Sequence, residues 1–267
     1  MLKLKHLALA FCILITSQTA NAQLGFSHEI GVIAGPVQFR SDFGNRNDSE
    51  TNFKNSGLGI GIVHYLNFAY RADCNCYTTD TYFNDHFKLR NEISFNTTNL
   101  EHLGKWVDSS KTSIEANQLR GHTGQANNLD IGTQLEFFPF SIRSFQSFGY
   151  SFAPFVSLGV HYTSFTPKVA TNYDNPDPLA FGDVTDPSNF YSAWAPGSVD
   201  ASPGSTWSIV TSIGVRYKLN KLSDLMLDLR GQYYFSDWVD GLNHQLDYNK
   251  YNDWLIWLNV GYIYYLN

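Results

Sequence analysis

Eight segments of the chain place apolar residues at every second position. In the last of them, residues 254–267, one register contains Trp254, Ile256, Leu258 and further apolar or aromatic residues, whereas the other register mixes in Asn and Gly. A two-residue period is typical of β-strands whose two faces meet unlike surroundings. An all-β fold is therefore expected. The segments are 28–39, 57–68, 86–95, 128–138, 153–162, 206–219, 224–235 and 254–267.

The second face of these strands indicates which solvent the apolar face meets. It carries glycines, as at Gly57, Gly59 and Gly61, together with charges of both signs. Charged residues make up 16% of the chain, against roughly 25% in soluble domains. Small and charged side chains suit the inside of a narrow barrel, and a continuous apolar face suits lipid. Because strands in lipid must close to pair every backbone group, we predict an eight-stranded antiparallel transmembrane β-barrel of the outer-membrane type with long extracellular loops. A soluble, exported all-β domain is the alternative.

The first 22 residues have the pattern of a secretory signal peptide. Lys3 and Lys5 precede the apolar run 7–15, and an Ala-Asn-Ala cleavage site follows at 20–22. A retained anchor is the alternative, but the apolar run is shorter than the about 20 residues that a spanning helix needs. We therefore expect residues 1–22 to be removed and residues 23–267 to form one barrel domain in the cell outer membrane.

The connections between the segments alternate in length. In outer-membrane barrels, extracellular loops are long and periplasmic turns are short. With both termini in the periplasm, this rule assigns 39–56, 98–126, 165–205 and 237–252 to the extracellular side. It assigns 69–85, 139–151 and 220–222 to the periplasmic side.

Charged residues on the second face are expected to meet inside the barrel. Eight strands leave room only for packed side chains, so these charges should form a salt-bridge plug rather than line an open pore. His161 is expected to point into the lumen and to pair with a carboxylate there. The predicted lumenal charge network comprises Lys88, Arg90, Glu92, Glu136, Arg216, Asp228 and Arg230.

Two cysteines, Cys74 and Cys76, lie in one predicted periplasmic turn. After export to an oxidising compartment, a local disulfide is the expected state. The alternative is a metal site, for which His64 and His86 are the nearby candidates, but their spacing matches no zinc motif. The sequence therefore predicts no metal and no cofactor.

Catalysis and nucleic-acid binding find little support in the sequence. Some small outer-membrane barrels modify lipids with His and Ser near the membrane boundary, and His64 falls on the predicted lipid face. No serine follows it at the second position, and no G-x-S-x-G motif occurs in the chain. The net charge of −6 comes without a basic stripe, which excludes the usual pattern of nucleic-acid binding. A non-enzymatic barrel is expected.

The order of segments resembles the PorG-like outer-membrane barrel family of the type IX secretion system. The resemblance rests on HEIGVIAGPVQF, FKLRNEISF, LDIGTQLEFFPF, FAPFVSLGVHYTSFTPK and the stretch that ends in YFSDWVDGLN. It implies a non-enzymatic outer-membrane anchor of the secretion and gliding machinery that contacts periplasmic ring proteins. The ADCNCY turn and the length of 165–205 depart from the family. They leave open a paralogous barrel with another partner, or a small barrel with ligand-binding or lipid-modifying activity.

If the resemblance holds, the periplasmic face is expected to bind the partner. The turn 139–151 carries Phe140, Arg143, Phe145 and Phe148. Aromatic residues beside an arginine are the residue types that anchor protein interfaces. We therefore predict partner binding at Arg143, Phe145 and Phe148. The alternative is that these phenylalanines belong to the inner aromatic girdle of the barrel.

Overall fold

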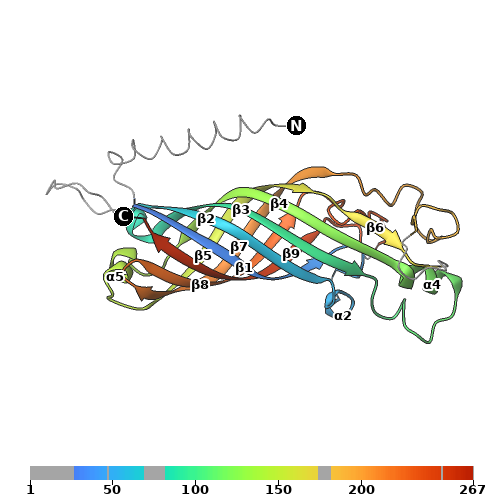
Figure 1. Ribbon diagram of the computed structural model, residues 1–267, viewed down its shortest axis with the longest axis horizontal. Helices are drawn as coiled ribbons and strands as arrows, with labels where there is room; N and C mark the ends of the chain where they lie inside the picture. Colours follow the sequence, from blue (N-terminus) through green and yellow to red (C-terminus); the bar gives the residue numbers. More distant parts are fainter. Residues whose placement is uncertain (1–26, 47, 69–81, 174–181, 248, 267) are drawn as a thin grey trace.

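The computed structural model describes residues 27–46, 48–68, 82–173, 182–247 and 249–266, and within them nine strands form one sheet, eight of which close into a barrel (Figure 1). The predicted signal peptide and the predicted turn that contains Cys74 and Cys76 lie outside the described residues. The strands are β1 (Ser27–Arg40), β2 (Ser56–Asn67), β3 (Phe87–Glu101), β4 (His122–Phe137), β5 (Phe152–Phe165), β6 (Lys168–Thr171), β7 (Gly204–Asn220), β8 (Ser223–Tyr234) and β9 (Trp254–Tyr265).

Eight of the strands close into a ring. The order β3-β2-β1-β9-β8-β7-β5-β4 is completed by pairing of β3 with β4, and every pairing is antiparallel. The ninth, β6, adds to the outer end of β4 through His122–Gln125. The ring leaves no unpaired strand edge, which satisfies the backbone hydrogen bonds of a lipid-embedded sheet. The predicted eight-stranded barrel is confirmed.

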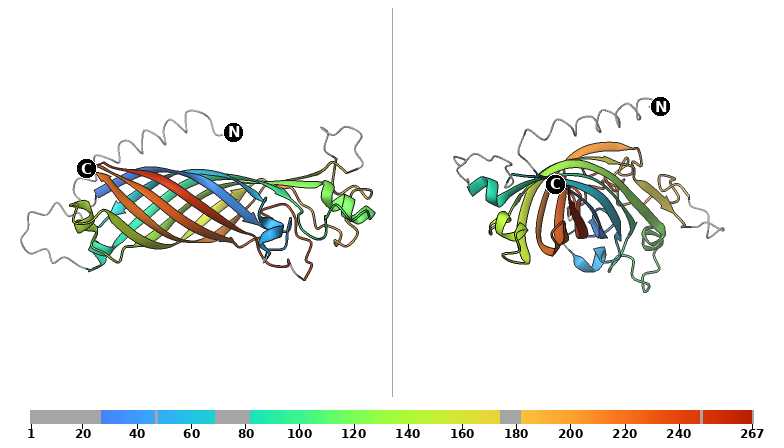
Figure 2. Two further views of the ribbon diagram at one scale, coloured as in Figure 1. Left: turned by 90° about the horizontal axis from the view of Figure 1, so that it is seen from below. Right: turned by 60° about the vertical axis from the view of Figure 1, so that its left-hand side comes forward.

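The strand register shows how strongly the strands tilt. Tyr264 of β9 pairs with Ile30 of β1. The paired residues, followed from strand to strand around the barrel, lead back to β9 at Trp254, ten residues from the starting point. This stagger accompanies a steep tilt of the strands to the barrel axis, which Figure 2 shows. The partners along the row are Tyr264, Ile30, His64, Asn91, Thr133, Val160, Ile209, Tyr233 and Trp254.

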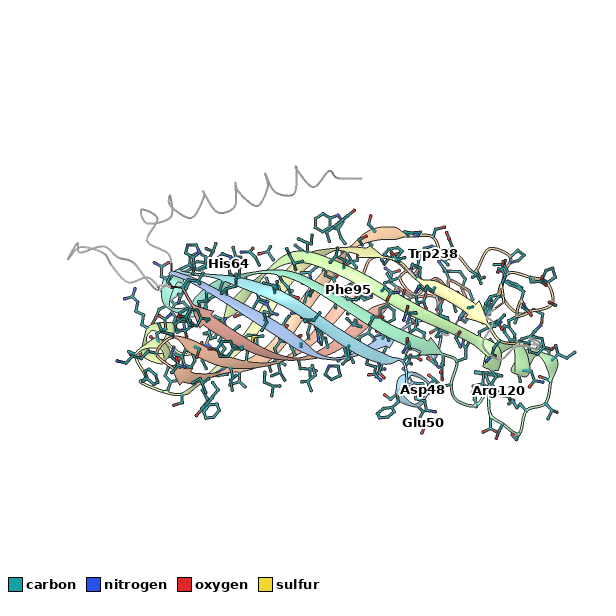
Figure 3. The ribbon with its side chains drawn as sticks, viewed as in Figure 1. Asp48, Glu50, His64, Phe95, Arg120 and Trp238 are labelled. Atoms are coloured by element: carbon teal, nitrogen blue, oxygen red, sulfur yellow. The ribbon has the colours of Figure 1, made fainter. Side chains whose placement is uncertain are left out.

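Inward and outward residues alternate as the sequence predicts. On β9, Leu255, Trp257 and Ile263 are buried, whereas Leu258 and Val260 are exposed. The exposed face is apolar on every strand of the ring, and Phe95 of β3 points outward from it in Figure 3. No helix within the described ranges is long and apolar enough to cross a membrane. A belt of exposed apolar side chains on a closed barrel is the surface that lipid covers.

The two ends of the barrel differ. The described termini and the short β7–β8 turn lie at one end, and the longer connections, with β6, gather at the other (Figures 1 and 2). Long loops mark the extracellular end. Four short helices lie in the described connections: α2 (Ser49–Asn52) and α4 (Ile114–Gly121) at the extracellular end, and α3 (Tyr82–His86) and α5 (Ile142–Gln146) at the periplasmic end.

The extracellular connections contain more strand than the sequence predicts. β3 and β4 stay paired to Glu101 and Thr123, so the predicted loop 98–126 shortens to 102–121. The extra residues are mostly polar and carry no apolar alternation, as expected where the hairpin stands beyond the lipid. In the same way, β6 occupies part of the predicted extracellular loop 165–205.

Candidate functional site

The lumen is crossed by ion pairs between opposite walls. β3 and β8 lie four strands apart in the ring of eight, which places them on opposite sides. Arg230 of β8 donates to both carboxylate oxygens of Glu92 on β3, at 2.6 and 2.7 Å. Arg90 of β3 reaches Asp228 of β8 at 2.9 Å. Side chains therefore meet across the full width of the barrel, as an eight-stranded interior allows.

All seven residues of the predicted lumenal charge network are buried and ion-paired. The structure adds Glu29, Asp224 and Lys218 to the network. Glu29 accepts from Lys88 and Arg216, each at 2.6 Å. The network thus contains five cations and five carboxylates: Lys88, Arg90, Arg216, Lys218 and Arg230 with Glu29, Glu92, Glu136, Asp224 and Asp228.

Two lumenal details differ from the prediction or were missed by it. Buried His161 contacts the side chain of Gln134, at 3.2 Å, rather than having a carboxylate as its hydrogen-bond partner. Trp257 fills the lumen beside β2, where a Cβ on Gly59 would lie 2.4 Å from the indole ring. The glycines that the sequence places on the inner face therefore make room for large side chains from neighbouring strands.

At the periplasmic end, the predicted partner-binding residues separate into two groups. Phe145 is 1% exposed, packs against Tyr150, and lies under the Lys218 ammonium at 5.3 Å. Its side chain is therefore part of the plug and is not available to a partner. Phe148 is exposed, as is Phe140, and Arg143 is half-buried with its backbone N–H donating to Asp85.

His64 lies on the outer face, as expected, near the periplasmic end (Figure 3). Its Nε2 is 3.0 Å from Nδ1 of His28, with which it stacks, and its Nδ1 is 3.5 Å from the amide nitrogen of Asn91. These are imidazole and amide contacts. A nucleophilic hydroxyl, which lipid hydrolysis would require of such a histidine, is not among them.

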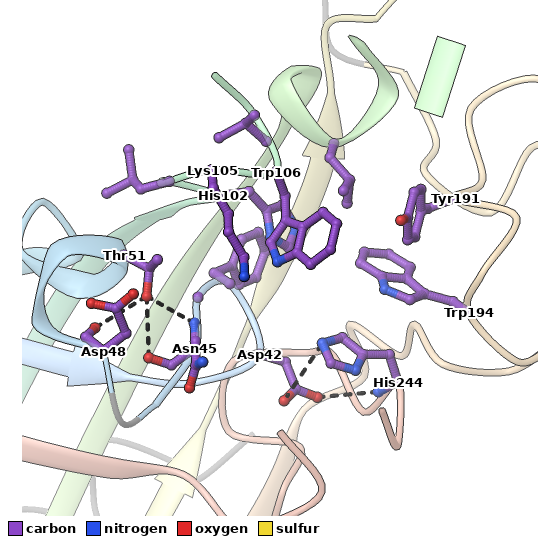
Figure 4. Close-up of a pocket in the computed structure, with 15 residues that line it drawn as sticks. Asp42, Asn45, Asp48, Thr51, His102, Lys105, Trp106, Tyr191, Trp194 and His244 are labelled. Carbon is purple, nitrogen blue, oxygen red and sulfur yellow. Dashed lines mark hydrogen bonds and ion pairs between the residues drawn. The ribbon is translucent and has the colours of Figure 1, made fainter. Parts of the chain in front are cut away.

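A cavity of about 140 Å³ lies among the extracellular loops. It is lined from the β1–β2, β3–β4, β5–β7 and β8–β9 connections, so no single segment of sequence reveals it. Figure 4 shows Trp106 and His102 on one wall, Asp42 and His244 opposite, and Trp194 at one side. We call this space the extracellular cavity.

Aromatic rings form most of the wall of the extracellular cavity. Trp194 is buried and is the centre of the cluster. Its ring lies 5.6 Å from His244, 5.7 Å from His102 and 5.6 Å from Tyr191, measured between centroids. Phe43 stacks on His102 at 5.0 Å. Packing of these rings from different loops holds the loops together as one cap over the barrel.

Beside the cavity, three buried aspartates share one guanidinium, and a fourth buried aspartate lies next to them. Arg46 places one nitrogen 3.0 Å from both Asp42 and Asp253 and also pairs with Asp237. Asp240 accepts from the backbone N–H of Asp42 at 2.9 Å. We call these four carboxylates and Arg46 the acid cluster; Asp42 is the member that lines the cavity. No motif in the sequence marks the cluster, because its members come from two loops far apart in the chain.

The acid cluster holds protons at neutral pH. Burial, reinforced by the charge of Asp240, raises the pKa of Asp42 to about 9. Burial raises the pKa of Asp237 to about 7 and that of Asp240 to about 6. In contrast, burial lowers the pKa of His244 to about 4. The site therefore contains more carboxylate than its single guanidinium can neutralise.

The described residues include no group of three or more His, Cys, Asp or Glu side chains arranged to hold a metal ion. The contacts that the acid cluster makes are ion pairs and hydrogen bonds within the cap.

No protein-family model and no curated protein matches the chain. Solved structures of similar shape include a major outer membrane protein from Thermus thermophilus (15% identity, TM-score 0.45, 90% of this chain and 99% of that one). Neisserial surface protein A gives 10% identity and a TM-score of 0.44 over 89% and 96% of the two chains. Outer membrane protein OprG from Pseudomonas aeruginosa gives 12% identity and a TM-score of 0.39 over 90% of this chain and 97% of that one.

The membrane assignment follows from this chain's own strands. They close into a ring, their outer face is apolar, and their inner face pairs its charges. A closed barrel with an apolar outer face and a charged, paired interior is the structure that a lipid bilayer requires. The protein is an eight-stranded β-barrel of the outer membrane.

Proposed function

We propose that this protein is a non-conducting outer-membrane anchor that acts through its two ends. The observation that carries the proposal is the pairing of β3 with β8 across the lumen, by Arg230–Glu92 and Arg90–Asp228. A buried, hydrogen-bonded pair that loses one partner leaves an uncompensated charge, so these residues do not part readily to admit a solute. With the lumen filled, the surfaces left for function are the periplasmic turns and the extracellular cap.

We propose further that the periplasmic end joins the type IX secretion machinery by binding its ring proteins, without enzymatic activity. The resemblance to the PorG-like family supports this role. Phe140 and Phe148 are exposed beside Arg143, which supports partner binding at this turn. Phe145 is excluded from the proposed contact surface because it is buried.

The test replaces Phe140 and Phe148 together by serine. The variant barrel should still shift in mobility on gels after boiling, while co-purification with periplasmic ring proteins falls by about tenfold or more, as for loss of interface anchors. Phe53→Ser, which changes an exposed aromatic at the opposite end, is the matched control and should leave co-purification unchanged.

Two outcomes oppose the proposal. Loss of membrane insertion in the double variant would assign these phenylalanines to the inner aromatic girdle. Unchanged co-purification, together with normal secretion in a strain that lacks the protein, would indicate a paralogous barrel with another partner.

A second candidate function is ligand binding at the extracellular end. The extracellular cavity and its buried aspartate favour it. Ligand binding at the extracellular end does not depend on which protein binds the periplasmic end.

A further inference from the structure

The extracellular cavity is large enough for one small ring or one branched headgroup. Its volume of about 140 Å³ is close to that of an engineered protein cavity, about 150 Å³, that binds benzene. That engineered cavity is lined by apolar side chains alone. Here the wall is mixed, with indole and phenyl rings on several sides and a carboxylate on another. The occupant should therefore be small, should contact aromatic faces and should carry polarity on one side.

The polar side of the cavity favours a positively charged ligand. The side chain of Asp42 is fully buried, and its Oδ1 accepts no hydrogen bond, although Arg46 lies 3.0 Å away in an ion pair. That guanidinium is divided among Asp42, Asp237 and Asp253, and Asp240 adds a fourth carboxylate. A buried carboxylate is stable when charge and hydrogen bonds compensate it. A second cation in the cavity would supply both, in place of the proton that Asp42 holds at neutral pH.

The aromatic wall favours the same class of ligand. Indole and phenyl faces attract cations through their negative quadrupole, and aromatic cages are used to bind quaternary ammonium groups. Trp106 already attracts cations, because the ammonium groups of Lys105 and Lys111 lie 5.0 and 5.6 Å from its ring. Both lysines are exposed, so they can turn into solvent when a ligand enters.

We propose that the extracellular cavity binds an organic ammonium group. The nitrogen lies toward Asp42, and the attached carbon groups contact Trp106 and Trp194 across the cavity. The proposal goes beyond the anchoring role and does not depend on it. The ammonium can come from a free amine such as choline or ethanolamine, or from a lysine side chain of an external protein.

The experiment uses the full-length mature barrel in detergent and titrates it with choline, ethanolamine and acetyl-lysine amide with a free ε-amine, by calorimetry. Glucose is the neutral control of similar size. Binding of one ammonium compound and none of glucose is expected. Comparison of the three amines distinguishes a quaternary headgroup, a primary headgroup and a peptide side chain as the source.

Two variants test the contacts. Asp42→Asn should weaken amine binding by about tenfold or more because it removes the compensating charge. Trp106→Ala should weaken it by a smaller factor; Trp106 is 51% exposed, so its loss leaves the cap folded. Asp108→Asn and Phe53→Ala, which change exposed residues of the same end that do not line the cavity, are the matched controls and should bind as the wild type does.

Three results would overturn the proposal. These are glucose binding in place of the amines, the absence of heat with all three amines, and amine binding that both Asp42→Asn and Trp106→Ala leave unchanged. Should Asp42→Asn fail to give a heat-modifiable barrel, the Trp106→Ala result decides alone.

Discussion

The lumen and the extracellular acid cluster both bury charged side chains, but they balance them differently. In the lumenal charge network, five cations meet five carboxylates, and Glu92 receives a bidentate guanidinium at 2.6 and 2.7 Å. In the acid cluster, Asp42, Asp237 and Asp253 share Arg46, and Asp240 adds a fourth carboxylate. Balanced charges suit a permanent plug. An excess of carboxylate suits a site that binds protons or another cation reversibly.

The largest effect is expected from breaking a lumenal pair. Arg230→Met removes the bidentate partner of Glu92 inside the barrel, which should lower the free energy of unfolding by about 3–5 kcal/mol. Urea unfolding in lipid vesicles, followed by the gel shift, measures it. The double variant Arg230→Met with Glu92→Leu should recover part of the loss, because Arg90 retains Asp228. A loss equal to that of the single variant would contradict the charge-balance argument.

Arg46→Met tests the acid cluster in the same way, and its effect should stay local. Three aspartates lose their shared guanidinium, so the cap should open and the extracellular loops should become about tenfold more sensitive to proteinase K, as for a locally unfolded segment. The barrel itself should keep its heat-modifiable mobility. Unfolding of the whole barrel would show that cap and barrel form one cooperative unit.

The acid cluster also predicts a pH dependence. The pKa values of Asp237 and Asp42, about 7 and about 9 in the folded cap, exceed the ordinary value near 3.8, so the folded cap holds protons that an open cap releases. Stability is therefore lost as pH rises through these values. His244, with a pKa lowered to about 4, instead holds fewer protons in the folded cap than in an open one, and this opposite effect operates only below about pH 6.5.

Above about pH 6.5, therefore, only the carboxylate effect remains, and loop cleavage should accelerate several-fold by about pH 9. The rate is normalised at each pH to cleavage of an unfolded substrate. Asp42→Asn should flatten the profile. A cleavage rate that falls with rising pH would contradict the raised carboxylate pKa values.

The smallest effect is expected at an exposed pair of the same cap. Lys250 and Asp247 are 3.9 Å apart on the surface. Lys250→Ala should change stability by less than about 0.5 kcal/mol, because solvent screens exposed ion pairs. A change as large as that of Arg46→Met would mean that burial is not what distinguishes the acid cluster.

The barrel is predictable from sequence because alternation is a local signal. Each strand repeats its two faces every second residue, so Arg90 and Glu92 can be assigned to the lumen without knowing their partners. Glu29 and Asp224 follow the same rule, but they lie near strand ends, where the apolar pattern that marks a strand begins or stops. The inward position of Phe145 was missed because a five-residue helix, α5, breaks the alternation.

The extracellular cavity was not predictable in this way. The backbone N–H of His244 donates to Asp42 at 3.1 Å across 202 residues of sequence, and neither residue belongs to a motif. Trp194 lies in the predicted extracellular loop 165–205, which contains none of the eight alternating segments. Such a site depends on how the loops pack against one another, which the two-residue period of the strands does not predict.

The most direct test of a plugged lumen is electrical. The purified barrel is inserted into a planar lipid bilayer, and the current is recorded under an applied voltage in salt solution, with insertion verified by the gel shift of the same sample. Because side chains of β3 and β8 meet across the lumen, we expect no stable conductance steps. Replacing Arg90, Arg230, Glu92 and Asp228 together by alanine is the control that should produce steps if the barrel survives. Regular ohmic steps from the unaltered protein would show that the lumen conducts ions and is not plugged.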